Sequence, residues 1–251
     1  MPSAWEYNKT RRGRARSSSS FMSHGRSGRK SSSSSVHNFA SSDGNTYKVN
    51  DFVHSDKIIG IIKPYVETYC DVVGGGNCGF RVVSSYIFGT EEKWQSVRHH
   101  LRNEVIANCF WYESVLIDGV DAAINRISWD GGACSQEHWM LAYNDLFLIA
   151  TLYNAAVMFF GYLGGNNSSF CGTVLPVYAP STATRPEREI FIAHLGTHCR
   201  HYIRLNLSPN FPVPHVLEWW KQHHERSVEG WDRIYAARTT QWTRLVQLRS
   251  S

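Results

Sequence analysis

Long hydrophobic runs are missing from this sequence of 251 residues. No uninterrupted stretch of about 18 apolar residues occurs, so we expect no transmembrane helix and no membrane partner. The opening residues, MPSAWEYNKTRRGRAR, also lack an apolar core as long as that of a secretory signal peptide. We therefore expect a protein that is not secreted.

Paired cysteines are also missing. The chain contains no CxxC pair, and its six cysteines are scattered at Cys70, Cys78, Cys109, Cys134, Cys171 and Cys199. With 42% hydrophobic residues, a chain of this length can build one core without disulfide bonds. This pattern is typical of a reducing compartment, so we expect an intracellular protein, cytoplasmic or nuclear.

Positive charge is concentrated at one end of the chain. Residues 1–50 hold nine lysines and arginines against two acidic residues, a charge of +7, whereas the rest holds 17 against 19, or −2. Because this stretch is rich in Ser, Arg and Gly and poor in aliphatic residues, we predict a disordered tail. It is either a solvated tail or an arm that makes weak nucleic-acid contacts by charge alone. We place one domain at 51–240 and a C-terminal tail at 241–251.

The domain pattern mixes helices and strands. Residues 78–88 suit a buried helix with Asn77 as its N-cap, and a second helix follows in TEEKWQSVRHHLRNEVIA. A short helix and then a strand or extended run ending near Val73 are expected in SDKIIGIIKPYVETYCDVV. Further strands are expected in VMFFGY, TVLPVYAP, EIFIAHL and RHYIRLNL, and a terminal helix in LEWWKQHHERSVEGWDRIY. Its tryptophans are expected to pack in the core. The pattern predicts an α+β domain with a small central sheet flanked by helices.

The glycine loop GGGNC, residues 74–78, is the strongest sign of chemistry. A cysteine at the start of a helix lies at the positive end of the helix dipole, which favours the thiolate. The backbone N–H groups of Gly75, Gly76 and Asn77 can turn toward one point and form an oxyanion hole. The alternative is that Cys78 is a small core residue after a tight turn.

A cysteine nucleophile needs a histidine that the fold brings close. His201 is the best placed, because HYIRLNL alternates like a strand and His201 opens it. On spacing alone, a purely structural His201 is equally acceptable. A metal cluster of His194, His198, Cys199 and His201 is a weaker alternative, since no second ligand pair lies at metal-ligand spacing.

The stretch DVVGGGNCGFR at 71–81, the WQSVR helix at 94–98 and the late His201-Tyr202 pair together resemble the OTU (ovarian-tumour) family of cysteine proteases. The variety found in transposon-related proteins is the most similar, and the resemblance covers roughly residues 55–235. It implies a papain-like fold that hydrolyses the isopeptide bond after the C-terminal glycine of ubiquitin or a ubiquitin-like modifier. It also implies that Cys78 is the nucleophile and His201 the base, without a metal or cofactor, and that ubiquitin or polyubiquitin is the partner.

The sequence departs from this family at two positions. Gly75 stands where the family usually has aspartate, and we expect Gly75→Asp to order the loop and raise kcat. Ile203 stands where the family often has Asp or Asn, so the residue that orients the imidazole must come from elsewhere. Asp71 is our candidate, although a turn or capping role would also suit it.

Other residues in the matched region have a structural interpretation. Trp139, Asp145 and Ala150 lie where such proteins carry an aromatic residue followed by the central helix, and we expect them to support the fold. Two further functional classes stay open from the sequence. The chain could be a catalytically impaired ubiquitin-binding module, or a nucleic-acid-associated scaffold that uses its basic tail.

Overall fold

The computed structural model of the chain describes residues 46–48, 51, 53–161, 170–196 and 200–250. Most of the predicted tail at 1–50 therefore lies outside the described residues, as do His198 and Cys199. Three residues assigned to that tail instead form a strand, Thr46–Lys48. No helix in the described part of the chain is long and apolar enough to cross a membrane.

The described residues form one six-stranded sheet, made of β1 (Thr46–Lys48), β2 (Val66–Cys70), β3 (Ala155–Gly161), β4 (Cys171–Val174), β5 (Arg188–His194) and β6 (Tyr202–Leu207). The strand order is β1-β2-β6-β5-β3-β4. β3 and β5 run parallel, and every other neighbouring pair is antiparallel. A mixed sheet of this kind, with helices around it, confirms the predicted α+β class.

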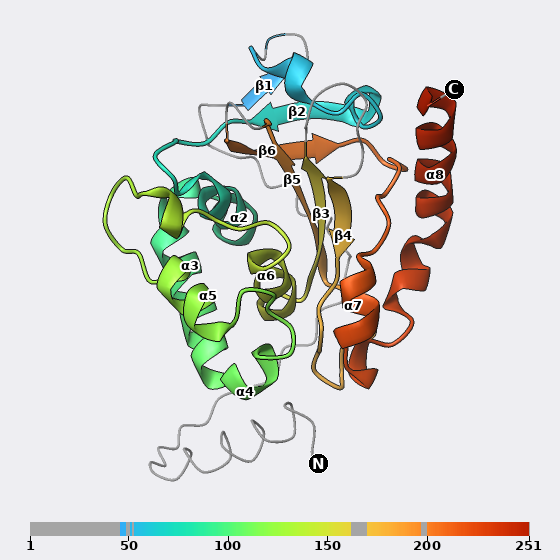
Figure 1. Ribbon diagram of the computed structural model, residues 1–251. Helices are drawn as coiled ribbons and strands as arrows, with labels where there is room; N and C mark the ends of the chain where they lie inside the picture. Colours follow the sequence, from blue (N-terminus) through green and yellow to red (C-terminus); the bar gives the residue numbers. More distant parts are fainter. Residues whose placement is uncertain (1–45, 49–50, 52, 162–169, 197–199, 251) are drawn as a thin grey trace, which may run out of the picture.

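Helices lie on both sides of the sheet. They are α2 (Cys78–Phe88), α3 (Trp94–Ala107), α4 (Cys109–Tyr112), α5 (Val120–Ile127), α6 (Asp145–Leu152), α7 (Glu218–His223) and α8 (Ala236–Ser250). In Figure 1 the first five gather on one side, and α7 and α8 lie on the other. Short 3-10 turns are η1 (Ser55–Lys57), η2 (Lys63–Tyr65), η3 (Glu91–Lys93), η4 (Gln136–His138), η5 (Arg226–Val228) and η6 (Trp231–Tyr235).

The core is built around β3 and α6. All seven residues of β3, AAVMFFG, are buried, as expected for a strand that is covered on both faces. The first seven residues of α6 are buried as well, so this short helix has no solvent face along most of its length. α2 packs against α3 and β6 and ends at Gly89, whose φ of +71° gives the left-handed turn that commonly stops a helix. Cys78 thus begins a helix that is held rigidly by the core.

Two sequence predictions need correction at the C-terminal end. The expected long helix is only α7, which ends where the backbone becomes extended at His224, and two 3-10 turns follow, the second of them after Gly230 with its φ of +80°. The expected tail at 241–251 is instead most of α8, which continues to Ser250. Its sequence is polar, but Trp242 is only 3% exposed and its ring lies against Phe160. One aromatic anchor therefore docks a helix whose average composition suggested a tail.

This anchor gives a test of the C-terminal correction. Trp242→Ala should lower the free energy of unfolding by about 3–5 kcal/mol, because it removes a buried indole and leaves a cavity. Arg244→Ala, an exposed change on the same helix, should stay within about 0.5 kcal/mol. Urea unfolding followed by circular dichroism measures both. Equal stability of the two variants would mean that α8 is not docked on the sheet.

Candidate active site

Asp71 and His201 meet where two neighbouring strands come together. Asp71 directly follows β2, and His201 directly precedes β6. The two strands are antiparallel, so the end of one lies beside the start of the other. The Nε2 atom of His201 lies 2.7 Å from Oδ1 of Asp71, although the residues are 130 positions apart in sequence. This chain has the fully buried Ile203 where an Asp or Asn was expected, and the carboxylate beside His201 comes instead from Asp71, directly after β2.

The environment of His201 favours its charged form. Burial by itself lowers the pKa of His201, but the hydrogen bond with Asp71 and a side-chain hydrogen bond with Cys78 raise that pKa to about 10. Burial by itself raises the pKa of Asp71, but the hydrogen bond with His201 outweighs this effect and leaves that pKa below its usual value. Because Nε2 is occupied by Asp71, Nδ1 is the ring nitrogen available to the Cys78 thiol.

Cys78 is the first residue of α2 and is 5% exposed. Its helix has 11 residues, and the helix dipole favours a negative charge at this end. The structure therefore brings together a thiol, an imidazole and a carboxylate in the order that nucleophilic catalysis requires.

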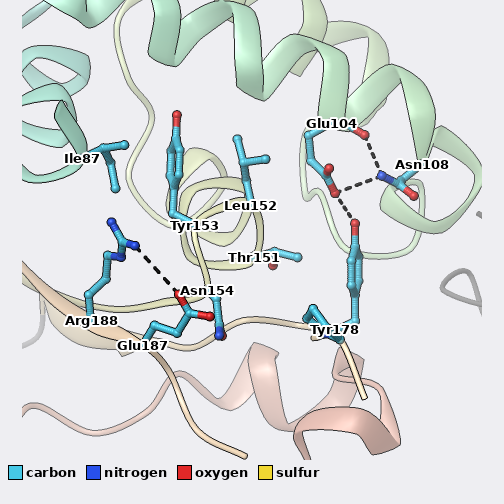
Figure 2. A pocket seen from close by; sticks show the side chains of 11 residues that line it. Ile87, Glu104, Asn108, Thr151, Leu152, Tyr153, Asn154, Tyr178, Glu187 and Arg188 are labelled. Atoms are coloured by element: carbon cyan, nitrogen blue, oxygen red, sulfur yellow. Dashed lines mark hydrogen bonds and ion pairs between the residues drawn. The ribbon is translucent and has the colours of Figure 1, made fainter. Parts of the chain in front are cut away.

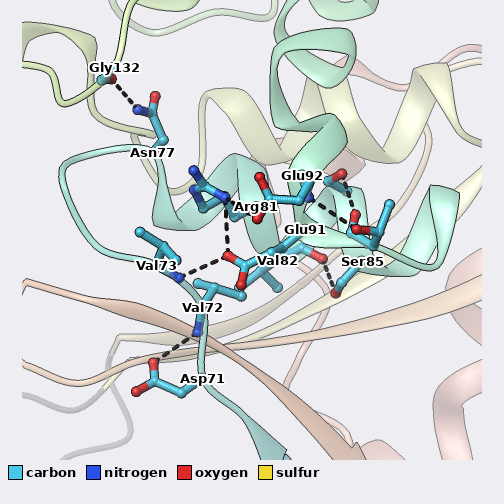
Figure 3. A network of polar contacts seen from close by, with 12 residues as sticks. Asp71, Val72, Val73, Asn77, Arg81, Val82, Ser85, Glu91, Glu92 and Gly132 are labelled. Carbon is cyan, nitrogen blue, oxygen red and sulfur yellow. Dashed lines mark hydrogen bonds and ion pairs between the residues drawn. The ribbon is translucent and has the colours of Figure 1, made fainter. Parts of the chain in front are cut away.

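The loop before Cys78 is held at several points. Asp71 accepts a hydrogen bond from the backbone N–H of Val72, and Glu91 accepts one from the N–H of Val73, as Figure 3 shows. The same Glu91 carboxylate pairs with Arg81 at 3.3 Å. Further along, the carbonyl of Gly75 accepts a 2.9 Å hydrogen bond from the N–H of Cys134. A loop of three glycines is thus tied down from both ends.

Two of these glycines have backbone conformations that other residues rarely adopt. Gly75 has a φ of +87° and Gly76 a φ of +88°. A Cβ on Gly76 would lie 2.4 Å from Nε1 of Trp139, and a Cβ on Gly75 would lie 3.3 Å from Cβ of Ala133. The expectation that Gly75→Asp helps is therefore reversed, because the loop is already ordered and the new side chain would strain it.

The side chain of Asn77 does not act as the predicted N-cap. It makes no capping hydrogen bond, and its Nδ2 instead donates to the carbonyl of Gly132 at 2.8 Å (Figure 3). Among the described residues, no acceptor receives a hydrogen bond from the backbone N–H groups of residues 75–78. These donors are therefore available for an oxyanion that forms beside the Cys78 sulfur.

Of the alternative histidine cluster, His194 and His201 lie among the described residues, whereas His198 and Cys199 lie outside them. His194 lies at the end of β5, and its ring packs against Tyr202 and Phe170. Burial lowers the pKa of His194 to about 4, so this ring stays neutral near pH 7. No group of three potential metal ligands occurs among the described residues.

Sequence reasoning missed Arg98 as part of this site. Arg98 is 1% exposed and contacts Asn77, the neighbour of the cysteine. A signal was present, because Arg98 follows Trp94 by four residues and precedes Leu101 by three on the apolar face of α3. A charged residue at such a position needs a buried partner.

A separate hollow lies away from Cys78. It has a volume of about 540 Å³ and is lined mainly from the ends of α3 and α6 and from the start of β5 (Figure 2). Glu104 there accepts hydrogen bonds from Asn108 and Tyr178. None of the residues at the candidate active site lines this hollow.

The chain matches no family model and no curated protein. Among solved structures, it is similar to the OTU domain of OTUD1, with 15% identity, a TM-score of 0.39, and coverage of 55% of this chain and 84% of that one. It is also similar to the viral OTU domain protease from Dera Ghazi Khan virus, with 16% identity, a TM-score of 0.39, and coverage of 66% of this chain and 87% of that one. The Hazara virus OTU, solved bound to ubiquitin, is similar with 16% identity, a TM-score of 0.33, and coverage of 64% of this chain and 86% of that one. Likeness at this level does not assign the chain to a family.

The raised pKa of His201 predicts how stability depends on pH. A group whose pKa is higher in the folded state stabilises fully below its unfolded pKa of 6.5, and this contribution is lost as pH rises toward about 10. The loss in unfolding free energy caused by Asp71→Asn should therefore be larger at pH 6 than at pH 10. Urea unfolding across this range measures it, with the exposed Glu113→Gln as control. A loss that does not change with pH would contradict the Asp71–His201 pairing.

The loop glycines offer a matched pair of substitutions. Gly75→Ala places a side chain at a φ of +87° and should lower the free energy of unfolding by about 1–2 kcal/mol. Gly74→Ala meets no atom within 4 Å and should leave stability within about 1 kcal/mol of the wild type. Gly75→Asp should also lower stability, because its Cβ would lie 3.3 Å from Cβ of Ala133 at the same positive φ. A more stable Gly75→Asp variant would mean that the loop does not need glycine there.

Proposed function

We propose that the chain is an OTU-type cysteine protease that hydrolyses isopeptide bonds after the C-terminal glycine of ubiquitin or a ubiquitin-like modifier. One observation carries the chemistry. The imidazole of His201 lies between the carboxylate of Asp71, 2.7 Å away, and the thiol of Cys78 at the start of α2. The ubiquitin substrate is inferred from the resemblance of residues 71–81 to the OTU motif.

The reaction begins from the form of the site in which His201 already carries the proton of the Cys78 thiol, as its raised pKa of about 10 favours. Asp71 holds the ring by Nε2 and stabilises the imidazolium, so Nδ1 carries this proton. The thiolate then attacks the carbonyl carbon of the terminal glycine, and the carbonyl oxygen becomes an oxyanion. Backbone N–H groups of residues 75–78 donate hydrogen bonds to that oxygen.

Collapse of this intermediate breaks the bond to the target lysine. His201 returns the proton to the departing amine, and the ubiquitin carboxyl group stays on Cys78 as a thioester. A water molecule, deprotonated by His201, then attacks the thioester and frees the carboxylate and the thiol. No metal or cofactor takes part in this scheme.

A ubiquitin that carries a C-terminal electrophile tests the proposal directly. The wild-type chain should become labelled stoichiometrically, and Cys78→Ala should abolish labelling because the bond forms to that sulfur. His201→Ala should slow cleavage of a ubiquitin substrate by about 10²–10⁴-fold, since it removes the general base. Mass spectrometry and cleavage kinetics measure these effects.

Cys109→Ala is the matched control, because this cysteine is free and exposed on α4. It should label as the wild type does. Binding of ubiquitin without labelling would favour a non-catalytic ubiquitin binder. Absence of both binding and labelling would reject ubiquitin as the substrate.

A further inference from the structure

Arg98 is a buried cation without a carboxylate among its hydrogen-bond partners in the described residues. Its Nε and Nη2 donate to Oδ1 of Asn77, at 3.2 and 2.7 Å. Its Nη1 donates to the carbonyl of Arg126 and its Nη2 to that of His138, at 2.9 and 2.8 Å. Burial lowers the pKa of Arg98 to about 10. Burying a charge against neutral oxygens is costly, so this arrangement calls for a function.

The bonds from Arg98 decide what the side chain of Asn77 can do. An asparagine just before a helix ordinarily accepts a hydrogen bond from a backbone N–H of the first turn. Here Nε and Nη2 of Arg98 both donate to the side-chain oxygen of Asn77, and the Nδ2 of Asn77 donates to the carbonyl of Gly132. Asn77 therefore makes no cap, and its side chain instead ties the loop before Cys78 to Arg98 and to Gly132.

The same guanidinium also orders the segment that faces the loop. It binds the carbonyl of His138, and the 131–139 segment in turn is hydrogen-bonded to the loop. Gly132 accepts from Asn77, and the N–H of Cys134 donates to Gly75. The face of the guanidinium lies 3.8 Å from the ring centre of Phe80, one turn into α2. Arg98 thus contacts the helix, the loop and the facing segment at once.

We propose that Arg98 is a positioning residue for the reaction at Cys78. By binding Asn77 and the facing segment, it fixes the loop at 74–77, so that the N–H groups of this loop and of Cys78 are held in place to donate to the oxyanion. The inference rests on the proposed function for its acyl-transfer chemistry, but not on ubiquitin as the substrate.

Two small reagents separate this role from a general effect on folding. Acetyl transfer from p-nitrophenyl acetate to Cys78 passes through an oxyanion and releases p-nitrophenolate. Alkylation by iodoacetamide displaces iodide and forms no oxyanion, so it reports only the thiol and its histidine. Both rates are measured at Cys78 by mass spectrometry of the peptide that contains it, in the full chain.

Arg98→Gln should slow acetylation of Cys78 about ten- to a hundredfold, and change alkylation less than about twofold. Arg98→Lys keeps the charge but loses the planar guanidinium, so its acetylation rate should lie between those of the wild type and of Arg98→Gln. Arg102→Gln is the matched control, because Arg102 is exposed on the same helix and binds Ser128. It should leave both rates unchanged.

Asn77→Ala tests the same contact from its other side, also if Arg98→Gln fails to fold. It should slow acetylation selectively, and the double variant should be no slower than the slower single variant. Unchanged acetylation in a folded Arg98→Gln or Asn77→Ala variant would overturn the inference, as would an equal loss of both rates. A wild-type chain that is acetylated with this dependence on Arg98 but ignores ubiquitin would reject the substrate and keep the role of Arg98.

Discussion

The pairing of β2 with β6 is the constraint on which the candidate site depends. These strands lie far apart in the sequence, yet their antiparallel register sets Cys70 opposite Arg204. The residues that follow one strand and precede the other, Asp71 and His201, are thereby fixed at one end of the sheet. A change of register by one residue would turn alternate side chains to the opposite face and separate the pair. The rigid sheet therefore fixes the distance between Asp71 and His201.

A second constraint comes from buried cations on the helical side. Arg126, at the end of α5, binds the fully buried Asp145 at 2.7 Å and also pairs with Asp118. Asp145 in turn accepts a hydrogen bond from the N–H of Leu141, so the start of α6 holds the segment that leads into it. The carbonyl of Arg126 is one of the acceptors of Arg98. Charge burial thus links the central helix to the loop beside Cys78 through a continuous set of hydrogen bonds.

The glycine loop at 74–77 adopts backbone angles that need glycine, and it is nevertheless held in one conformation. Glycine gives the backbone a left-handed conformation at Gly75 and Gly76, and it allows Trp139 to approach closely. The same freedom makes the loop entropically costly to order. Hydrogen bonds to Glu91, to Cys134 and through Asn77 offset that cost, and they do so without occupying the N–H groups nearest to the sulfur. The loop is fixed and its donors remain open.

Local features of this protein could be read from its sequence, and contacts between distant segments could not. The span of α2, from Cys78 to Phe88, follows from a glycine run, a helical apolar pattern and a terminal glycine, which all lie within a few residues of one another. Asp71 could be named as a candidate partner of His201, but only strand pairing decided their distance. The role of Asn77 was misjudged because its capping preference is local, whereas the competing donor, Arg98, comes from another helix. The C-terminal helix was missed for the same reason, since one buried tryptophan outweighs a polar average. Propensity acts between neighbours in the sequence, while burial and buried charge act between neighbours in space.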